Sequence, residues 1–268
     1  MHRFYLPPER CAGATLRLDG REAHHALHVL RLKHGELVAV LDGIGNEFMG
    51  TVENAVRNAV TLTVSLKNFV PAPPSSVTLL VGVPKGKIIE SIIQKAVELG
   101  VRRIVPILSE RVVTQLDGED AENKRDKWQT VAIAAIKQCG ATWLPKVEAP
   151  VTIEQFHGCS GVSVERRTIQ QSSGFLPKAA TQFDLSLVGS LQKERRHPRE
   201  VLREFEAQHG RLPQSVGVWI GPEGDFTPDE LQAIQNSGAQ PISLGRLVLR
   251  VETAAVYCLS ILNYELNR

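Results

Sequence analysis

Hydrophobic and polar residues follow two different patterns, one near the N-terminus and one over the rest of the chain. In the first part, short apolar runs at residues 37–41, 47–52 and 59–64 are separated by Gly, Asp and Asn. Such runs predict strands joined by tight turns, and together they favour a small β barrel. Residues 21–32 place apolar side chains near helical spacing, which predicts one helix beside the strands.

In the second part, apolar runs alternate with segments of helical periodicity. Residues 77–83 form an apolar run that predicts a buried strand, and the apolar side chains of residues 87–99 recur on one helical face. Further strand and helix pairs are predicted at residues 103–108 and 124–138, at 185–188 and 198–207, and at 216–220 with a helix after Thr227. Thr227 and Glu230 predict a capping box at the start of that last helix, with Pro228 at its first position. This alternation predicts an α/β fold with a mainly parallel sheet and helices on both faces.

Closely spaced prolines separate the two patterns at residues 71–76, and they stiffen the chain into an extended form. A length of 268 residues predicts about two domains of roughly 150 residues each. We therefore expect a domain at residues 1–70, a linker at 71–76 and a domain at 77–268. Residues 156–177 are rich in Gly, Ser and Gln, which predicts an exposed connection within the second domain.

The composition is that of an ordinary globular chain. Lys and Arg number 31 against 29 Asp and Glu, and 43% of the residues are hydrophobic. No apolar run approaches the roughly 18 residues that span a bilayer, and the first residues lack the apolar core of a signal peptide. We therefore expect a cytoplasmic protein. Its cysteines are spaced unlike zinc ligands and are expected to be free thiols; they are Cys11, Cys139, Cys159 and Cys258.

Two loops of the second part carry the clearest chemical signal. Residues 220–226 directly follow a predicted strand, and residues 243–254 lead into an almost uncharged helix at 254–262. In parallel sheets ligands bind at the carboxyl ends of strands, and glycines there let the backbone approach a ligand closely. Glycine and proline are also the ordinary residues of tight turns. Arg250 and Glu252 fit a structural ion pair and a catalytic pair equally well.

Other motifs are weaker. Residues 82–88 lack the spacing and the final Ser or Thr of a phosphate loop. His24 and His28 are four residues apart, a spacing that allows two histidines on a helix to bind one metal ion, but no third ligand is nearby. A position on the RNA-facing side of the helix explains these two histidines better. Basic residues near Phe4 and Tyr5 indicate a nucleic-acid surface, although an ordinary solvated face has the same composition. These basic residues are Arg3, Arg10, Arg21, Arg31 and Lys33.

The two loops resemble the paired motifs of the SPOUT methyltransferases. More narrowly, the whole chain is similar to the ribosomal RNA small subunit methyltransferase E family. The similarity also includes residues 2–5, 24–33, 94–101 and 109–111. It covers nearly the full length, and the order and spacing of the matching strings together make it specific.

The resemblance implies an α/β protein with a C-terminal SPOUT α/β trefoil-knot domain and a small N-terminal PUA-like β-barrel domain for RNA. It implies S-adenosyl-L-methionine as the cofactor, S-adenosyl-L-homocysteine as its product, and no metal. The implied reaction is methylation of N3 of a specific uridine in 16S rRNA of the small ribosomal subunit. The family is homodimeric, and the helix at residues 254–262 is either the interface or part of the core. A non-catalytic rRNA-binding assembly factor, and a SPOUT enzyme acting on tRNA or on a ribose 2′-hydroxyl, are the alternatives.

The resemblance and the reaction together assign roles to residues. A uracil N3 carries a proton, so the site needs a base or a cation that stabilises the charge left behind. Arg250 is the expected cation, and Glu252 or Glu223 is expected either to take the proton or to position Arg250. The expected cofactor contacts are Ile220, Gly221, Pro222, Glu223, Gly224, Leu244, Gly245, Leu247, Leu249 and Gly189. The expected RNA contacts are Arg3, Arg21, His25, His28, Arg31 and Lys33.

Three positions depart from the pattern of the family. Ala141 stands where relatives often have Arg, which puts an RNA contact there in question. Asp225 stands where a second Gly is usual, and an acid is compatible with the start of a helix. Val251 replaces a frequent Thr, which keeps the shape of the side chain and loses its hydroxyl.

Overall fold

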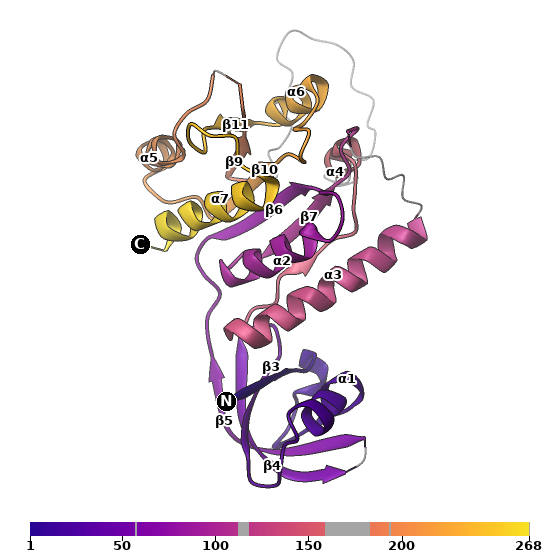
Figure 1. The fold of residues 1–268 in the computed structure, drawn as a ribbon. Helices are drawn as coiled ribbons and strands as arrows, with labels where there is room; N and C mark the ends of the chain where they lie inside the picture. Colours follow the sequence, from indigo (N-terminus) through magenta and orange to yellow (C-terminus); the bar gives the residue numbers. More distant parts are fainter. Residues whose placement is uncertain (57, 112–117, 159–182, 193, 268) are drawn as a thin grey trace, which may run out of the picture. The chain divides into compact units, whose positions relative to one another are not determined.

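The computed structural model describes residues 1–56, 58–111, 118–158, 183–192 and 194–267 (Figure 1). Most of the connection expected at residues 156–177 lies outside the described residues, as does Cys159. The chain divides into two compact units. Met1–Pro73 and Gln129–Lys146 form the first, and Pro74–Trp128 and Val147–Arg268 form the second.

The first unit is built on one curled sheet of five strands, a half-barrel. The strands lie in the order β1-β3-β4-β5-β2; β1 pairs with β3 in parallel, and the other pairs are antiparallel. The concave face encloses apolar side chains such as Phe4, Leu16, Val40 and Leu62, all of them buried. The strands are β1 (His2–Tyr5), β2 (Thr15–Leu18), β3 (Leu37–Leu41), β4 (Asn46–Val56) and β5 (Ala59–Phe69).

The helix expected at residues 21–32 is shorter than predicted, and its hydrogen bonding changes from α-helical to π-helical along its length. After η1 (Pro8–Arg10) and β2, the chain forms α1 (Gly20–His24) and continues as a π-helical segment, η2 (His25–Val29). The amide of Leu30 donates to the carbonyl of His25 at 2.9 Å, five residues back. Arg31 then adopts a left-handed backbone, with φ of 56°, which ends the helix. Single π turns of this kind are frequent at functional sites.

The end of the long helix α3 (Gly118–Cys139) belongs to the first unit. There Lys137 Nζ lies 2.7 Å from Glu22 Oε1, and both side chains are largely buried. After the helix, the indole Nε1 of Trp143 donates to the carbonyl of Val70 at 2.9 Å. A Cβ on Gly45 would lie 2.8 Å from the rings of Phe69 and Trp143, so this close packing requires glycine.

The second unit contains the predicted parallel sheet, in the order β11-β9-β10-β6-β7-β8. All strand pairs from β11 to β7 are parallel. Apolar residues fill β6 and β10 because helices cover both faces of the sheet, as the continuous apolar runs predicted. The strands are β6 (Ser76–Gly82), β7 (Arg103–Ile107), β8 (Lys146–Val147), β9 (Leu185–Gly189), β10 (Ser215–Ile220) and β11 (Ala239–Ile242).

Helices α2 (Ile88–Glu98) and α7 (Val251–Leu266) pack against each other on one side of this sheet (Figure 1). Helices α4 (Ile153–Gly158) and α6 (Pro228–Asn236) pack around Trp219, and α5 (Pro198–His209) follows β9. The capping box predicted at the start of α6 is confirmed: the amide of Glu230 donates to Thr227 Oγ1 at 3.2 Å, and the amide of Thr227 donates to Glu230 Oε2 at 2.8 Å. No helix in the described ranges is long and apolar enough to cross a membrane.

Candidate functional site

A cavity of about 450 Å³ lies in the second unit, where β9, β10 and β11 end and α7 begins. Crevices at the carboxyl ends of parallel strands are the usual place for ligands in such sheets. The lining residues are Ile88, Gly189, Ser190, Leu191, Arg195, Ile220, Gly221, Pro222, Glu223, Asp225, Leu244, Gly245, Leu247, Val248, Leu249, Arg250, Val251, Glu252 and Ala254. Every expected cofactor contact except Gly224 is therefore on the wall of one cavity, together with all three expected catalytic residues.

The loop after β10 packs directly against the end of β6. A Cβ on Gly82 would lie 2.5 Å from Cδ of Pro222, so only glycine leaves room for this loop. A Cβ on Gly221 would in turn lie 2.7 Å from Asp225 Oδ1. Gly82 was not among the predicted site residues, although a glycine inside a strand pattern is a known sign of close backbone approach.

The backbone of the same loop explains why an aspartate can stand at position 225, where the family usually has glycine. It has φ of 59°, a left-handed conformation that suits glycine and that Asp tolerates better than most residues. Its amide donates to the carbonyl of Pro222 at 2.9 Å, and its Oδ1 accepts from the amide of Phe226 at 2.8 Å. The departure from the usual glycine is thus accommodated by a local hydrogen bond.

Two charged residues hold the tip of this loop. Glu223 Oε1 accepts a hydrogen bond from the amide of Lys85 at 3.0 Å, which ties the loop to the segment after β6. The guanidinium of Arg111 donates to the carbonyl of Gly224. Gly224 is therefore held from outside the cavity, and Glu223 is already engaged by a backbone donor.

The second loop brings a charged pair to the start of α7. Arg250 is the N-cap residue and is exposed, Val251 is buried in the first turn, and Glu252 is partly buried. Within the described residues, neither Arg250 nor Glu252 has a salt-bridge or side-chain hydrogen-bond partner. The structural ion pair that the sequence left open is not formed, so both charges remain available to a ligand.

A third wall comes from the end of β9. A Cβ on Gly189 would touch Cδ1 of Ile220 at 3.3 Å and Cδ1 of Leu244 at 3.5 Å, so the glycine keeps this wall open. Arg195 also lines the cavity, and its Nη1 donates to the carbonyl of Ser190 at 3.0 Å. Arg195 was not among the predicted site residues; the available signal was the basic run at residues 193–199, which follows a predicted strand.

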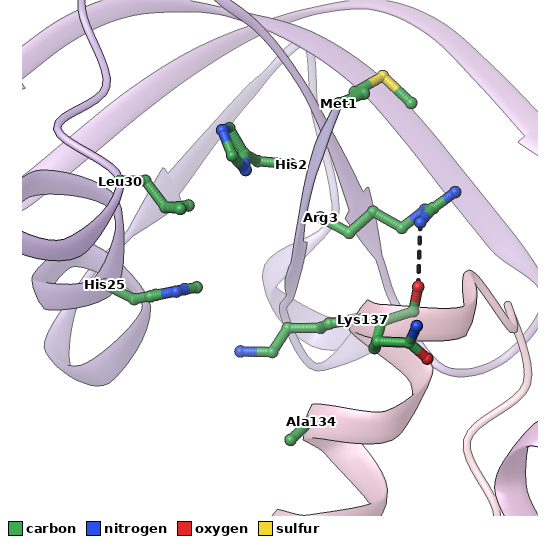
Figure 2. A pocket seen from close by; sticks show the side chains of 8 residues that line it. Met1, His2, Arg3, His25, Leu30, Ala134 and Lys137 are labelled. Atoms are coloured by element: carbon green, nitrogen blue, oxygen red, sulfur yellow. Dashed lines mark hydrogen bonds between the residues drawn. The ribbon is translucent and has the colours of Figure 1, made fainter.

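The expected RNA contacts all lie in the first unit. Arg3 and His25 line a second hollow, drawn in Figure 2. The remaining four expected contacts, Arg21, His28, Arg31 and Lys33, are exposed. The rings of His24 and His28 are 4.8 Å apart, but no group of three or more metal-ligating side chains occurs in the described part of the chain.

Ala141 lies beside an arginine supplied by another element. A Cβ on the neighbouring Gly140 would be 3.0 Å from the guanidinium of Arg3, which reaches this turn from β1. Nη1 of Arg3 also donates to the carbonyl of Gln138 at 3.4 Å. The turn that carries Ala141 is thus in contact with a cation despite the missing side chain.

The second unit thus has a strand-end cavity in a parallel sheet, and the first unit is a curled sheet with exposed basic residues beside it. A family model described as an RNA methyltransferase domain matches residues 71–263, and one described as an RNA methyltransferase PUA domain matches residues 18–65. The chain is 31% identical over 264 residues to ribosomal RNA small subunit methyltransferase E of Synechocystis sp., covering 98% of this chain and 77% of that protein. The chain belongs to the ribosomal RNA small subunit methyltransferase E family.

Solved structures share this fold. A methyltransferase of Legionella pneumophila, in complex with S-adenosylmethionine, has a TM-score of 0.80 at 28% identity, covering 98% of this chain and 97% of that one. Ribosomal RNA small subunit methyltransferase E of Neisseria gonorrhoeae, also bound to S-adenosylmethionine, has a TM-score of 0.79 at 23% identity, covering 99% and 98%. The predicted fold class, a SPOUT trefoil-knot domain with a PUA-like domain, is confirmed.

Proposed function

We propose that this protein transfers the methyl group of S-adenosyl-L-methionine to N3 of one uridine in the 16S rRNA of the small ribosomal subunit. The observation that carries the proposal is the cavity at the ends of β9, β10 and β11. It combines the two glycine-containing loops with Arg250 and Glu252, two charges without a partner in the described residues. The protein is proposed to act in the cytoplasm, where the rRNA is.

The cavity fits the proposed cofactor in size and chemistry. A volume of about 450 Å³ is within the ordinary range of small-molecule sites. Gly189, Gly221 and Gly245 expose backbone groups along its wall, which suits hydrogen bonding to an adenine, while Ile220 and Leu249 offer apolar surface. These residues would hold the cofactor, whose sulfonium supplies an electrophilic methyl group when it is bound.

In the proposed mechanism the residues of this chain prepare the uridine. Glu252 accepts the proton of N3, because its carboxylate is partly buried in the cavity and has no other partner in the described residues. Arg250 stabilises the negative charge that the departing proton leaves on O2 and O4 of the base. The lone pair of N3 then forms the new bond to the methyl carbon, and the electrons of the broken bond stay on sulfur.

Glu223 has a different role in this scheme. Its carboxylate is bound to the amide of Lys85, so we assign it to holding the loop rather than to taking the proton. Alignment of the two reactants is the main requirement of an in-line methyl transfer, and it can supply roughly 7 to 11 kcal/mol of the barrier. A loop anchored on both sides, by Glu223 and by Arg111 at Gly224, serves that alignment.

The test is methylation of 16S rRNA, supplied both as an in vitro transcript and within unmethylated small ribosomal subunits, followed by mass spectrometry of its nucleosides. The expected product is a single N3-methyluridine. Arg250→Ala should lower kcat by about 10² to 10³, the usual loss for one charge-stabilising donor, with cofactor affinity nearly unchanged in calorimetry. An unmethylated 16S rRNA, a methylated tRNA or a methylated ribose would each contradict the proposal, as would wild-type turnover in Arg250→Ala.

A further inference from the structure

We infer that Arg195 binds the carboxylate of the methionine part of S-adenosyl-L-methionine. The inference deepens the proposed function and rests on it, since it takes the strand-end cavity as the cofactor site. Arg195 lines that cavity and is partly buried there. It belongs to residues 191–197, which lie outside the motifs that carry the resemblance to the family, so its role rests on the structure.

Hydrogen bonds to the end of β11 fix the backbone next to Arg195. The amide of Arg196 donates to the carbonyl of Pro241 at 3.1 Å. The amide of Ser243 donates to the carbonyl of Arg196 at 2.9 Å. The segment that carries Arg195 is therefore tied to the strand that leads into the second glycine-containing loop.

The guanidinium of Arg195 has one neutral partner and spare donors. Its Nη1 donates to the carbonyl of Ser190 at 3.0 Å, and no carboxylate in the described residues pairs with it. An arginine has five N–H donors in a planar fork, which can bind both oxygens of one carboxylate. A partly buried charge without a counter-ion costs free energy, so an anion in the cavity would stabilise this arginine.

The neighbouring arginines of the same basic run are placed differently. Arg196 Nη1 lies 2.5 Å from Glu204 Oε2. Arg199 Nε lies 2.8 Å from Glu265 Oε1. Neither of these arginines lines the cavity. In the described part of the run, Arg195 is thus the arginine that lines the cavity and lacks an acidic partner.

The other charged residues of the cavity leave the carboxylate to Arg195. Glu223 and Asp225 accept hydrogen bonds from backbone amides, and as anions they repel a carboxylate. Arg250 and Glu252 act on the uridine in the proposed mechanism. The carboxylate is the only anionic group of the cofactor, whose amino group and sulfonium are positive. Arg195 is the remaining cation among the described residues that line the cavity.

The test compares two ligands in calorimetry, S-adenosylmethionine and decarboxylated S-adenosylmethionine, which keeps the amino group and the sulfonium. The wild type should prefer the first by about tenfold or more, as expected for a hydrogen bond between two charged groups. Arg195→Met removes the guanidinium and keeps an unbranched side chain. In this variant the preference should disappear, because binding of S-adenosylmethionine weakens while binding of the decarboxylated compound stays near the wild-type value.

The matched control is Arg196→Met, which removes the arginine at the next position. Arg196 is exposed and does not line the cavity, and an exposed ion pair contributes little to stability. This variant should bind both ligands as the wild type does. Arg195→Lys keeps the charge but loses the planar fork, so it should retain part of the preference.

Three results would overturn the inference and leave the proposed function standing. The first is equal affinity of the wild type for the two ligands, which needs no variant and so decides the matter even if Arg195→Met does not fold. The second is an equal loss of affinity for both ligands in Arg195→Met, because Arg195 would then shape the loop instead of binding the carboxylate. The third is an Arg195→Met protein that keeps the preference and binds 16S rRNA more weakly, as expected for a phosphate contact.

Other results separate the two proposals in the opposite direction. If Arg195→Met loses the preference while the wild type leaves 16S rRNA unmethylated, the inference stands and the proposed function is wrong. If the wild type does not bind S-adenosylmethionine, the proposed function and the inference are both wrong.

Discussion

Burial decides which cysteine thiols of this protein can react with an alkylating reagent. Cys11 and Cys258 are buried, and burial raises the pKa of the Cys11 thiol to about 11 and that of Cys258 to about 12. Cys139 is exposed. The thiolate is the reactive form of cysteine, so the buried pair behave as small apolar residues of the core.

Iodoacetamide at pH 8 should therefore modify Cys139 in the folded protein and leave Cys258 almost untouched. A rise of the pKa from 9.0 to about 12 lowers the thiolate fraction of Cys258 on the order of a thousandfold. Mass spectrometry of the peptides gives the extent at each site, and unfolding in guanidinium is the control that exposes every thiol. Rapid native labelling of Cys258 would show that α7 is not packed as described.

His157 carries a pH dependence of stability. Its ring packs against those of Phe156 and Trp219, with centroid distances of 5.7 and 5.8 Å, and burial lowers its pKa below the usual 6.5. The unfolded chain therefore takes up this proton at a higher pH than the folded protein does. Stability should fall as pH drops below about 6.5, and the loss is complete once pH is below the folded pKa.

Urea unfolding at pH 7.5 and pH 5.5 measures this effect. His157→Leu removes the titrating ring and keeps an apolar side chain, so it should lose less unfolding free energy between the two pH values than the wild type. The exposed histidines His24 and His28 are present in both proteins and cancel in the comparison. An equal loss in both proteins would mean that His157 is not held in its neutral form.

Among the structural elements, the contact between β6 and the loop after β10 is the tightest constraint on the proposed cofactor cavity. Gly82 ends β6, and Pro222 fills the space that a side chain at position 82 would need. Backbone strain does not set this requirement, since Gly82 is not among the residues with positive φ; the requirement is steric. Position 82 therefore controls the shape of the cavity without lining it.

Gly82→Ala should displace Pro222 and cost roughly 1–3 kcal/mol of stability, as overpacking of a close contact does. Binding of S-adenosylmethionine in calorimetry should weaken with it. Gly224→Ala is the matched control, because its Cβ would meet only the flexible side chain of Arg111, at 3.2 Å, and a smaller loss is expected. Equal urea midpoints for Gly82→Ala and the wild type would refute the steric account.

For the molecule as a whole, exposed apolar side chains on α7 and in the loop before it are the surface through which we propose self-association. Tyr257 and Tyr264 are 46% and 74% exposed and lie seven residues apart, on one helical face. Leu247 and Val248, in the loop before α7, are 78% and 77% exposed. Exposed apolar surface marks interaction sites where it is contiguous, and we propose a second copy of this chain as the partner at α7.

Light scattering with size exclusion should give a mass near twice 29.5 kDa for the wild type. Tyr264→Glu should shift the protein toward the monomer, because it places a charge in the proposed apolar interface. Gln208→Glu, an exposed change on α5, serves as the control for added charge. If the wild type has the mass of a monomer, the proposed homodimer is wrong.

Local patterns predicted most elements of the second unit and the loops that form its cavity. They missed β1, β2, β8, α4 and β11, which are short and too weakly periodic to stand out. They also predicted one continuous helix at residues 21–32, where the structure has a π turn ending at a left-handed Arg31. Periodicity reports which face of a segment is buried, and it does not report a single extra residue in a helical turn.

Hydrophobic periodicity, turn residues and short motifs act over a few neighbouring residues, so they were enough to specify the α/β order, the capping box of α6 and the two glycine loops. The close contact of Pro222 with Gly82, the lack of an ion-pair partner for Arg250 and Glu252 among the described residues, and the hollow lined by Arg3 and Lys137 depend on residues far apart in the chain. Each is a matter of which atoms come into contact after folding. Only the packed structure contains that information, because contact distances between distant segments leave no periodic trace in a single sequence.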